Sequence, residues 1–541
     1  MNPHTARTPT SPNSVILSEA QRSRRTCHHA RSRTPNRFIR LRAVLSLLLL
    51  LITPLAHAHV GNKDVFETIT SGPYKFFVTI RTPTVIPGVA IIEVRSTGAP
   101  VSSLTITPLM LTGEASHHPP TPDALKPSAA DPNFYTGSLW LMGSGSWQVR
   151  FGINGAAGFA AASVPVPAAP TALLRMQRPL GILLGVLGII LVLGIVGIVT
   201  AAVRESRLAP GLQPDAPRRK RAALAGALAL AGAVFAVYWA SRWWDVEAAD
   251  YAADLYHSSD LRTKITGDNL DLRIGDPDPK SPGGWKPLKT KYLLLDHNHL
   301  MHLYAIREPE MDAVFHLHPA PSGDEALDIA LPSMPPGNYK LFADIVYRSG
   351  FPETEVATVT IPAGLPSVPL SPEDASATPP PLSQGDLGPT YKLPDGYTMV
   401  FDRPSTITAN TAYALRFRLL DPTGKPASDM QPYLGMPGHA AFVKSDFSTF
   451  AHTHPDGSAA MPAVMLANAS TAASAPSTAS NSPDMAGMAM PGMPTNAAPS
   501  EPLSSSVAFP YGFPSPGRYR IFIQMKHANT VETGVFDVEV H

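Results

Sequence analysis

Two long apolar runs dominate the hydrophobic pattern of this chain. Residues 179–203 hold no charged side chain, and residues 222–241 consist mostly of Ala, Leu, Gly and Val. A hydrocarbon core about 30 Å thick is crossed by about 20 helical residues. Because both runs reach that length and follow each other closely, the pattern predicts a two-helix transmembrane hairpin.

The segment between the two runs, residues 204–221, is strongly basic. Its acids are Glu205 and Asp215, and its basic side chains are Arg204, Arg207, Arg218, Arg219, Lys220 and Arg221. Cytoplasmic loops carry such an excess of Lys and Arg, so we expect this loop in the cytoplasm. Trp243 and Trp244 follow the second run, where an aromatic belt is typical. The flanking parts, 59–178 and 242–541, are then both expected outside the cytoplasm.

A third, shorter apolar run lies near the N-terminus. Arg40 and Arg42 precede Leu47–Leu51, and Ala56-His57-Ala58 follows. A basic region, a short apolar core and an A-x-A sequence are typical of a cleaved secretory signal. We therefore predict that residues 1–58 are an N-terminal extension and signal peptide. Together with the basic loop, this places the large domains on the extracytoplasmic, periplasmic side of the inner cell membrane.

Segments of alternating aromatic and aliphatic residues recur in the outward-facing parts. They begin at Gly145, Gly337 and Gly517, and each is followed by a turn and a second strand-like run. Such endings are typical of small antiparallel sandwiches. The pattern predicts a mainly β protein with three immunoglobulin-like or cupredoxin-like β-sandwich domains, at 59–166, 245–365 and 391–541.

Composition predicts how these domains are joined. Residues 167–178 form a short connection to the first helix, and residues 366–390 are rich in Pro and Ser. Both are expected to be linkers, the second one extended and mobile. The stretch 463–507 is rich in Ala, Ser, Pro and Met, which predicts a disordered insertion in the third domain.

Charge and cysteine content exclude several classes of function. The chain has 43 basic and 42 acidic residues, which gives no basic face for a nucleic-acid partner. Its single cysteine, Cys27, precedes the expected cleavage point. The mature chain would therefore lack disulfides, cysteine catalysis and a blue-copper site, which requires a thiolate.

The second and third domains resemble each other in sequence. Asp296-His-Asn-His-Leu-Met-His302 and Phe315-His-Leu-His-Pro319 correspond to Tyr433-Leu-Gly-Met-Pro-Gly-His439 and Phe450-Ala-His-Thr-His-Pro455. This self-similarity indicates an internal duplication. The alignment sets His299 opposite Met436 and Tyr347 opposite His527. It also pairs His302 with His439, His316 with His452, and His318 with His454.

The histidines of each copy are predicted to converge in space. Residues 302–307 and 313–318 are expected to form two strands around a turn at Pro309–Glu310, and alternate residues of a strand share a face. Three converging imidazoles are typical ligands of Zn, Cu or Ni. We predict two metal sites, at His302, His316 and His318 and at His439, His452 and His454, with His299, His527 and Met525 as further candidate ligands.

The compartment and the methionines favour copper among these metals, with zinc as the alternative. Thioethers suit Cu(I), and a Met-rich run lies in the predicted insertion, at Met485, Met488, Met490 and Met493. His59 would be the mature N-terminus, where its amine and imidazole could chelate copper together with His117–His118. Alternatively, His59 simply begins a strand.

The alternative to metal binding is that the histidines have structural roles. An H-x-H-P histidine can pin a hairpin by bonding to the backbone, which leaves a non-catalytic scaffold of a membrane complex as the alternative function. His297 is expected to be a solvated loop residue. The sequence contains no G-x-S-x-G, H-E-x-x-H, Walker or dinucleotide-binding motif, so we predict that the protein is not an enzyme.

The mature N-terminal segment resembles YtkA/FixH-like domains. The resemblance rests on His59-Val-Gly, Pro73-Tyr-Lys-Phe-Phe-Val-Thr-Ile and Val85-Ile-Pro-Gly-Val-Ala. It implies immunoglobulin-like sandwiches in an exported membrane protein, and some members of these families are associated with copper or cytochrome-oxidase biogenesis. Taken with the histidines, it leads us to expect a membrane-anchored copper-binding protein acting in sequestration or delivery. Its expected partners are the membrane and extracytoplasmic metal-handling or oxidase-assembly proteins.

Overall fold

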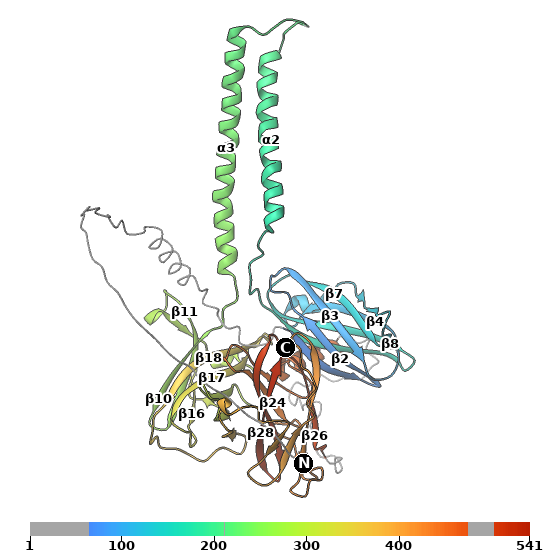
Figure 1. The fold of residues 1–541 in the computed structure, drawn as a ribbon, viewed down its shortest axis with the longest axis vertical. Coiled ribbons are helices and arrows are strands. Elements are labelled where there is room, and N and C mark those ends of the chain that lie inside the picture. The colour runs from blue at the N-terminus through green and yellow to red at the C-terminus, as the bar shows by residue number, and fades with distance from the viewer. Residues whose placement is uncertain (1–63, 210, 474–502) are drawn as a thin grey trace, which may run out of the picture. The chain divides into compact units, whose positions relative to one another are not determined.

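The computed structural model describes residues 64–209, 211–473 and 503–541 (Figure 1). The expected signal peptide, His59 and the methionines of the Met-rich run lie outside the described residues. The described chain is mainly β, with six antiparallel sheets and three α-helices. Short 3₁₀ helices lie at Glu114–His117, Pro282–Gly284, Thr290–Tyr292 and Leu382–Gln384.

The first sandwich buries alternate residues of its strands. In β2, Phe76, Val78 and Ile80 are buried between the two sheets, as a period-two hydrophobic pattern predicts. One sheet has the order β1-β2-β3-β7-β6 (Val65–Ser71, Tyr74–Arg81, Gly88–Ser96, Phe134–Leu141, Lys126–Pro127). The other has the order β5-β4-β8-β9 (Asp123–Ala124, Val101–Met110, Gly145–Gly155, Gly158–Ala168).

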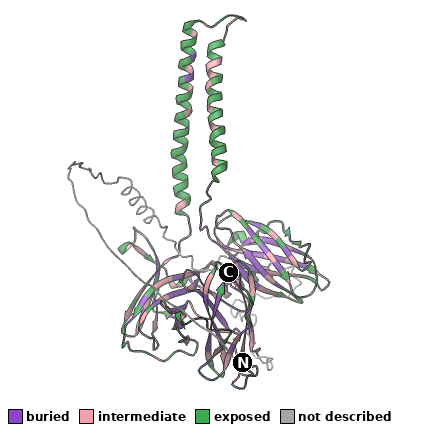
Figure 2. Cartoon of the chain, viewed as in Figure 1, coloured by how far each residue is buried: buried purple, intermediate pink, exposed green. Residues whose placement is uncertain are grey.

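Two long helices follow, α2 (Arg178–Glu205) and α3 (Ala216–Ala253), and both are long and apolar enough to cross a membrane. Figure 2 shows that their surfaces are mostly exposed. Both extend beyond the predicted runs, so the connecting loop shortens to residues 206–215. Asp215 caps α3 by accepting a 3.0 Å hydrogen bond from the backbone N–H of Arg218. Trp243 and Trp244, expected just past the helix, lie within α3 and are exposed.

The chain leaves and re-enters the helix pair at the same end. The Tyr251 hydroxyl near the end of α3 donates to the carbonyl of Ile86 in the first sandwich, at 2.9 Å. The backbone N–H of Tyr256 donates to the carbonyl of Pro170 at 2.8 Å. These contacts hold the starts of the second sandwich and of α2 together, as a helical hairpin requires.

The second sandwich follows α3 in the chain and includes part of residues 366–390, the segment predicted to be a linker. One sheet has the order β10-β11-β16-β15, with β12 paired to β11 (Asp260–Thr266, Asn269–Pro277, Leu327–Ala330, Ala320–Pro321, Trp285–Pro287). The other has the order β18-β17-β13-β14-β19 (Pro352–Ile361, Gly337–Val346, His302–Arg307, Val314–Leu317, Ala375–Ala377). The strand β19 belongs to the stretch expected to be a mobile linker, and it is instead hydrogen-bonded to β14.

The third sandwich repeats this plan. One sheet has the order β20-β21-β22-β26 (Thr390–Lys392, Thr398–Phe401, Ala412–Leu420, Ser506–Gly512). The other has the order β23-β27-β24-β25, with β28 paired to β27 (Met430–Gln431, Gly517–His527, His439–Lys444, Phe450–Thr453, Thr530–Val540). The predicted insertion 463–507 overlaps two ordered elements, the helix α4 (Met461–Ala473) and the strand β26. Ala463 and Ala467 of α4 are buried with Leu111 of the first sandwich, which explains why this Ala-rich segment is ordered.

The second and third sandwiches pack sheet against sheet. In β13, Leu303 and Ala305 join the core of their own sandwich, whereas Tyr304 and Ile306 join an apolar cluster shared with the third. Ala441 and Val443 of β24 join the same shared cluster, so both copies use the equivalent face. The remaining members of this interface cluster are Met311, Val314, Phe342, Phe447, Phe450, Phe522 and Val535.

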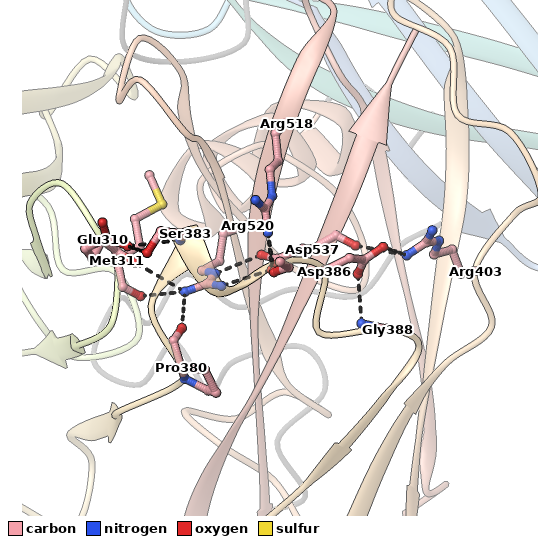
Figure 3. Close-up of polar contacts among 11 residues, drawn as sticks. Glu310, Met311, Pro380, Ser383, Asp386, Gly388, Arg403, Arg518, Arg520 and Asp537 are labelled. Atoms are coloured by element: carbon pink, nitrogen blue, oxygen red, sulfur yellow. Dashed lines mark hydrogen bonds and ion pairs between the residues drawn. The ribbon is translucent and has the colours of Figure 1, made fainter. Parts of the chain in front are cut away.

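A buried arginine fastens one end of this interface (Figure 3). Arg520 of β27 is fully buried and forms a two-point ion pair with Asp537 of β28, at 2.8 and 2.9 Å. Its remaining Nη1 donates to the carbonyls of Met311 and Pro380, at 3.0 and 2.9 Å. These carbonyls belong to the turn between β13 and β14 and to the segment after β19. Arg520 therefore links the third sandwich to the hairpin that carries His302 and His316.

Candidate metal centre

The β13–β14 hairpin aligns three histidines on one face. The register pairs Tyr304 with His316 and Leu303 with Leu317, so the next pair along the ladder is His302 with His318. Alternate residues of a strand share a face, and the three rings lie on the side that faces the third sandwich. Their ring centroids are 4.6 to 5.3 Å apart. The structure thus brings His302, His316 and His318 together as one of its possible ligand groups.

A tight turn ahead of β13 adds two more histidines. Asp296 and His299 exchange backbone hydrogen bonds of 2.7 and 2.8 Å across His297 and Asn298. Both central residues have positive φ angles of 48° and 71°, the combination of a type I′ turn. Tyr433 and Met436 close the same turn in the third sandwich, around Leu434 and Gly435. The duplication therefore extends to backbone conformation.

His297 is not a solvated loop residue. The turn directs it across the interface, where it is only 6 % exposed. Its ring lies 5.1 Å from that of His439 and 5.0 Å from that of His454, and the three form a second possible ligand group. Sequence reasoning missed this role because local composition does not reveal that another domain covers the turn.

His452 lies between the two groups. Its ring centroid is 5.3 Å from that of His302 and 5.4 Å from that of His439. His299 stacks on His318 at 4.1 Å. The predicted pair of separate three-histidine sites is therefore one continuous cluster of eight, which we call the octahistidine cluster: His297, His299, His302, His316, His318, His439, His452 and His454.

Four other predicted candidate ligands lie elsewhere. Met525 is buried in the apolar core of the third sandwich. His527 lies three residues beyond Gln524 on β27 and forms ion pairs with Asp395 and Asp429, at 2.9 and 3.3 Å. With Asp395 and Glu532 it makes a third, partly exposed group of possible ligands. His117 and His118 lie in and after a short exposed helix, where His118 pairs with Glu114.

Many ring nitrogens of the octahistidine cluster have no hydrogen-bond partner among the described residues. Both nitrogens of His297, His439 and His454 are buried and unpartnered, as are Nε2 of His318 and Nε2 of His452. Leaving a buried polar atom unpaired costs about 1–3 kcal/mol. Native proteins rarely leave several such atoms unpaired at one place, so these nitrogens mark the cluster as a candidate binding site.

Carboxylates orient two of these rings. Asp374 lies 2.9 Å from Nδ1 of His318 and leaves Nε2 directed into the cluster. Asp344 lies 3.3 Å from Nδ1 of His452 and likewise leaves its Nε2 unpartnered. A carboxylate on one imidazole nitrogen is the usual support of a histidine that binds metal through the other. Asp374 comes from the segment expected to be a mobile linker.

Other contacts hold the remaining rings of the second sandwich. Nδ1 of His302 lies 3.1 Å from Nε2 of His316, and Nδ1 of His316 lies 2.8 Å from the side-chain oxygen of Gln524. The Tyr433 hydroxyl lies 3.2 Å from the same Nδ1. Nε2 of His299 lies 3.0 Å from a carboxylate oxygen of Glu373. Gln524 and Tyr433 belong to the third sandwich, so each domain supports the other's histidines.

Burial favours the neutral form of six of these imidazoles. Desolvation, reinforced by the charge that neighbouring rings would carry, holds the pKa of His302, His316, His439 and His454 well below the ordinary value of 6.5. The same causes lower the pKa of His297 to about 4, although a backbone group of Leu434 opposes the shift. Burial also lowers the pKa of His318, against the opposing effect of Asp374. Neutral imidazole is the form that binds metal, so protons do not compete for these ligands near pH 7.

The donor set fits transition-metal ions. All eight side chains offer imidazole nitrogen, a ligand suited to Zn, Cu, Fe and Ni. Two groups have three ligand atoms within 4.8 Å of one another, each with all residues buried. Three protein ligands with an open position are typical of reactive or exchangeable centres, whereas closed structural zinc sites use four. The geometry can therefore hold more than one ion.

Comparisons with known proteins assign no function. Residues 391–541, the third sandwich, match the model of a domain of unknown function, DUF8832. No curated protein matches the chain. The expected kinship of the N-terminal segment with YtkA/FixH-like domains stays a prediction.

Matches among solved structures are distant. An engineered protein is 20 % identical over 18 % of this chain and 21 % of its own, with a TM-score of 0.14. Native alpha-2-macroglobulin from Escherichia coli is 10 % identical over 87 % of this chain and 26 % of its own, with a TM-score of 0.15. A Salmonella alpha-2-macroglobulin variant is 8 % identical over 88 % and 23 %, with a TM-score of 0.18. This chain thus spans about a quarter or less of their lengths, and the likenesses support no conclusion about its activity.

Proposed function

We propose that this protein binds transition-metal ions, copper first among them, in the octahistidine cluster between its second and third sandwiches. The proposal rests mainly on the buried imidazole nitrogens without hydrogen-bond partners, which both domains contribute to the cluster. A purely structural role would satisfy these nitrogens with protein hydrogen bonds, as the hairpin-pinning interpretation requires. The carboxylates beside His318 and His452 give further support, because each contacts Nδ1 and leaves Nε2 without a partner.

We infer a capacity of two ions. One ion of this class takes about four ligands, and eight imidazoles exceed that number. His297, His439 and His454 would hold one ion. His302, His316 and His318 would hold the other, which would replace the contact between Nδ1 of His302 and Nε2 of His316. His452 lies within reach of both groups and would complete either of them.

Copper is favoured over zinc by two properties of the site. Divalent copper binds nitrogen ligands more strongly than zinc does. Monovalent copper carries less charge into a buried space lined by neutral rings, and burying charge is costly. Zinc remains the alternative metal, and its uptake is measured in the titration described below.

The cellular role we propose is sequestration or delivery without catalytic turnover. Helices α2 and α3 would anchor the chain in the inner membrane, with the basic loop between them in the cytoplasm. The three sandwiches would then stand on the extracytoplasmic side, where metal-handling or oxidase-assembly proteins are the expected partners. The alternative, a scaffold whose histidines only join two domains, makes different predictions about metal.

A metal titration of the whole protein tests the proposal. The full chain in detergent micelles, stripped of metal by a chelator, is expected to take up about two equivalents of Cu(I). Calorimetry and elemental analysis measure the uptake, with Cu(II) and Zn(II) run in parallel. Replacing His302, His316 and His318 by Ala should remove at least one equivalent, and so should replacing His297, His439 and His454.

Matched controls make the result decisive. The double variant His117→Ala and His118→Ala removes two exposed histidines and should leave uptake unchanged. If the wild type takes up no metal, or if both triple variants take up as much metal as the wild type, the octahistidine cluster is not a metal centre. A scaffold role predicts that the triple variants melt at lower temperature whether or not metal is present.

A further inference from the structure

A cavity of about 210 Å³ lies where residues of all three sandwiches meet. Val65 and Trp147 contribute from the first sandwich, Asp344 and Phe351 from the second, and Ala463 of helix α4 from the third. The cavity reaches two members of the octahistidine cluster, because His452 and His454 form part of its lining. The metal ligands therefore adjoin an internal space on the side of the first sandwich.

The lining of this cavity is acidic. It contains the carboxylates of Asp64, Asp296, Asp344 and Glu353 and no lysine or arginine. Asp64 is neutralised by Arg81 at 3.0 Å, and Glu353 accepts hydrogen bonds from two tyrosine hydroxyls. Carboxylates in a low-dielectric cleft raise the local concentration of cations. The polar groups of the cavity thus suit a small cation better than an anion.

Two of these carboxylates touch the octahistidine cluster. An oxygen of Asp344 lies 3.3 Å from Nδ1 of His452, and an oxygen of Asp296 lies 3.7 Å from Nε2 of His297. That oxygen of Asp296 has no hydrogen-bond partner among the described residues, and the residue is only 8 % exposed. One oxygen of this deeply buried carboxyl therefore lies beside both the cavity and a candidate ligand and is available to a cation.

We propose that this cavity is the access route by which metal ions reach and leave the octahistidine cluster, with Asp344 and Asp296 as transfer ligands. This inference rests on the proposed metal-binding function and names its path. Carboxylate oxygens accept a partly hydrated ion, and the softer imidazoles then take it. No bond within the protein is made or broken, since the ion exchanges water and carboxylate for nitrogen ligands.

Helix α4 forms one wall of the route and offers a way to block it. Ala463 is only 2 % exposed and lines the cavity next to Ala459 and Ala460. In the variant Ala463→Phe, a benzyl group would occupy space that the cavity now leaves open. It changes no residue of the cluster, so the affinity of the cluster for metal is expected to remain.

Rate measurements on the full chain in detergent micelles test the route. Stopped-flow mixing with Cu(I) gives the loading rate, and mixing of the loaded protein with excess chelator gives the release rate. Ala463→Phe is expected to slow loading and release by the same factor, about tenfold or more, with unchanged stoichiometry. Asp344→Asn is expected to slow loading about tenfold, and the exposed control Asp131→Asn should have no effect.

The outcomes separate this inference from the function on which it rests. If the wild type binds no metal, the metal-binding function itself fails. If the wild type loads and both variants load at its rate, the cavity is not the route. A loss of stoichiometry in Asp344→Asn would show that Asp344 holds the bound ion, directly or through His452, and would overturn its transfer role. Circular dichroism of each variant shows whether it is folded, and the two variants alter different walls of the cavity.

Discussion

Replacing Arg520 by Met is expected to lower the free energy of unfolding by about 3 kcal/mol, because the change leaves a buried carboxylate without its main cation. Arg520 is fully buried, and Asp537 is 1 % exposed. Arg518 lies 3.0 Å from the same carboxylate and limits the loss. Denaturant titration of the full chain in micelles, followed by the sheet signal in circular dichroism, measures the change.

The duplication supplies a matched control for this prediction. Lys340 occupies the position in β17 that Arg520 occupies in β27, and it is only partly buried opposite Thr358. Lys340→Met is therefore expected to change stability by less than about 0.5 kcal/mol. Adding Asp537→Leu to Arg520→Met should restore stability, since it removes the uncompensated charge. Equal losses for Lys340→Met and Arg520→Met would contradict this account of the interface.

The same substitution should weaken metal binding at a distance. Arg520 holds the carbonyls of Met311 and Pro380, which flank the hairpin carrying His302, His316 and His318. Loosening that hairpin would reduce the preorganisation of three candidate ligands. The interface therefore has two ends. The apolar and ionic end sets the spacing between the two domains, and that spacing fixes the positions of the histidines at the other end.

Acid is expected to destabilise the metal-free protein through His297. Burial lowers its pKa from 6.5 to about 4, so between these values the unfolded chain binds a proton that the folded chain does not. Stability from this residue is therefore complete above pH 6.5 and is lost progressively as the pH falls to about 4. The shift corresponds to about 3 kcal/mol in the free energy of unfolding.

The difference in unfolding free energy between the wild type and a His297 variant isolates the effect of His297. Asp296 contributes with the opposite sign, because burial raises its pKa to about 7 and its folded form gains a proton as the pH falls. His297→Leu is the natural comparison, since Leu434 occupies the equivalent turn position in the third sandwich. The stability of the wild type minus that of His297→Leu should fall by about 3 kcal/mol from pH 7 to pH 4. A difference that does not vary with pH would show that His297 is not held neutral by burial.

Local patterns in the sequence predict much of this fold. The two apolar runs correspond to α2 and α3, whose ends differ from the prediction because polar residues continue each helix beyond its apolar part. The hairpin of β13 and β14 follows from strand alternation around a short turn, and so does the convergence of His302, His316 and His318. These features depend on residues within about twenty positions of one another in the sequence. The spacing of hydrophobic residues and the residue types at the turns determine them.

Long-range packing decided what the sequence alone left open. The two predicted histidine groups form one cluster because an apolar face of β13 lies on the equivalent face of β24, a match between surfaces far apart in the chain. That contact buries His297 and brings Tyr433 and Gln524 to His316. Within the second sandwich, β14 and His318 give β19 and Asp374 their partners, where Pro and Ser content predicted a mobile linker.

The sequence by itself indicated most of the candidate ligands, since imidazoles and the absence of thiolates in the expected mature chain are matters of composition, but it did not indicate His297. Only the tertiary structure decided that eight histidines form one cluster and that carboxylates contact two of the rings. The physical reason is that the contact between the second and third sandwiches both brings the imidazoles together and removes water from them. That contact depends on how well the two domain surfaces fit, which a local sequence pattern does not show.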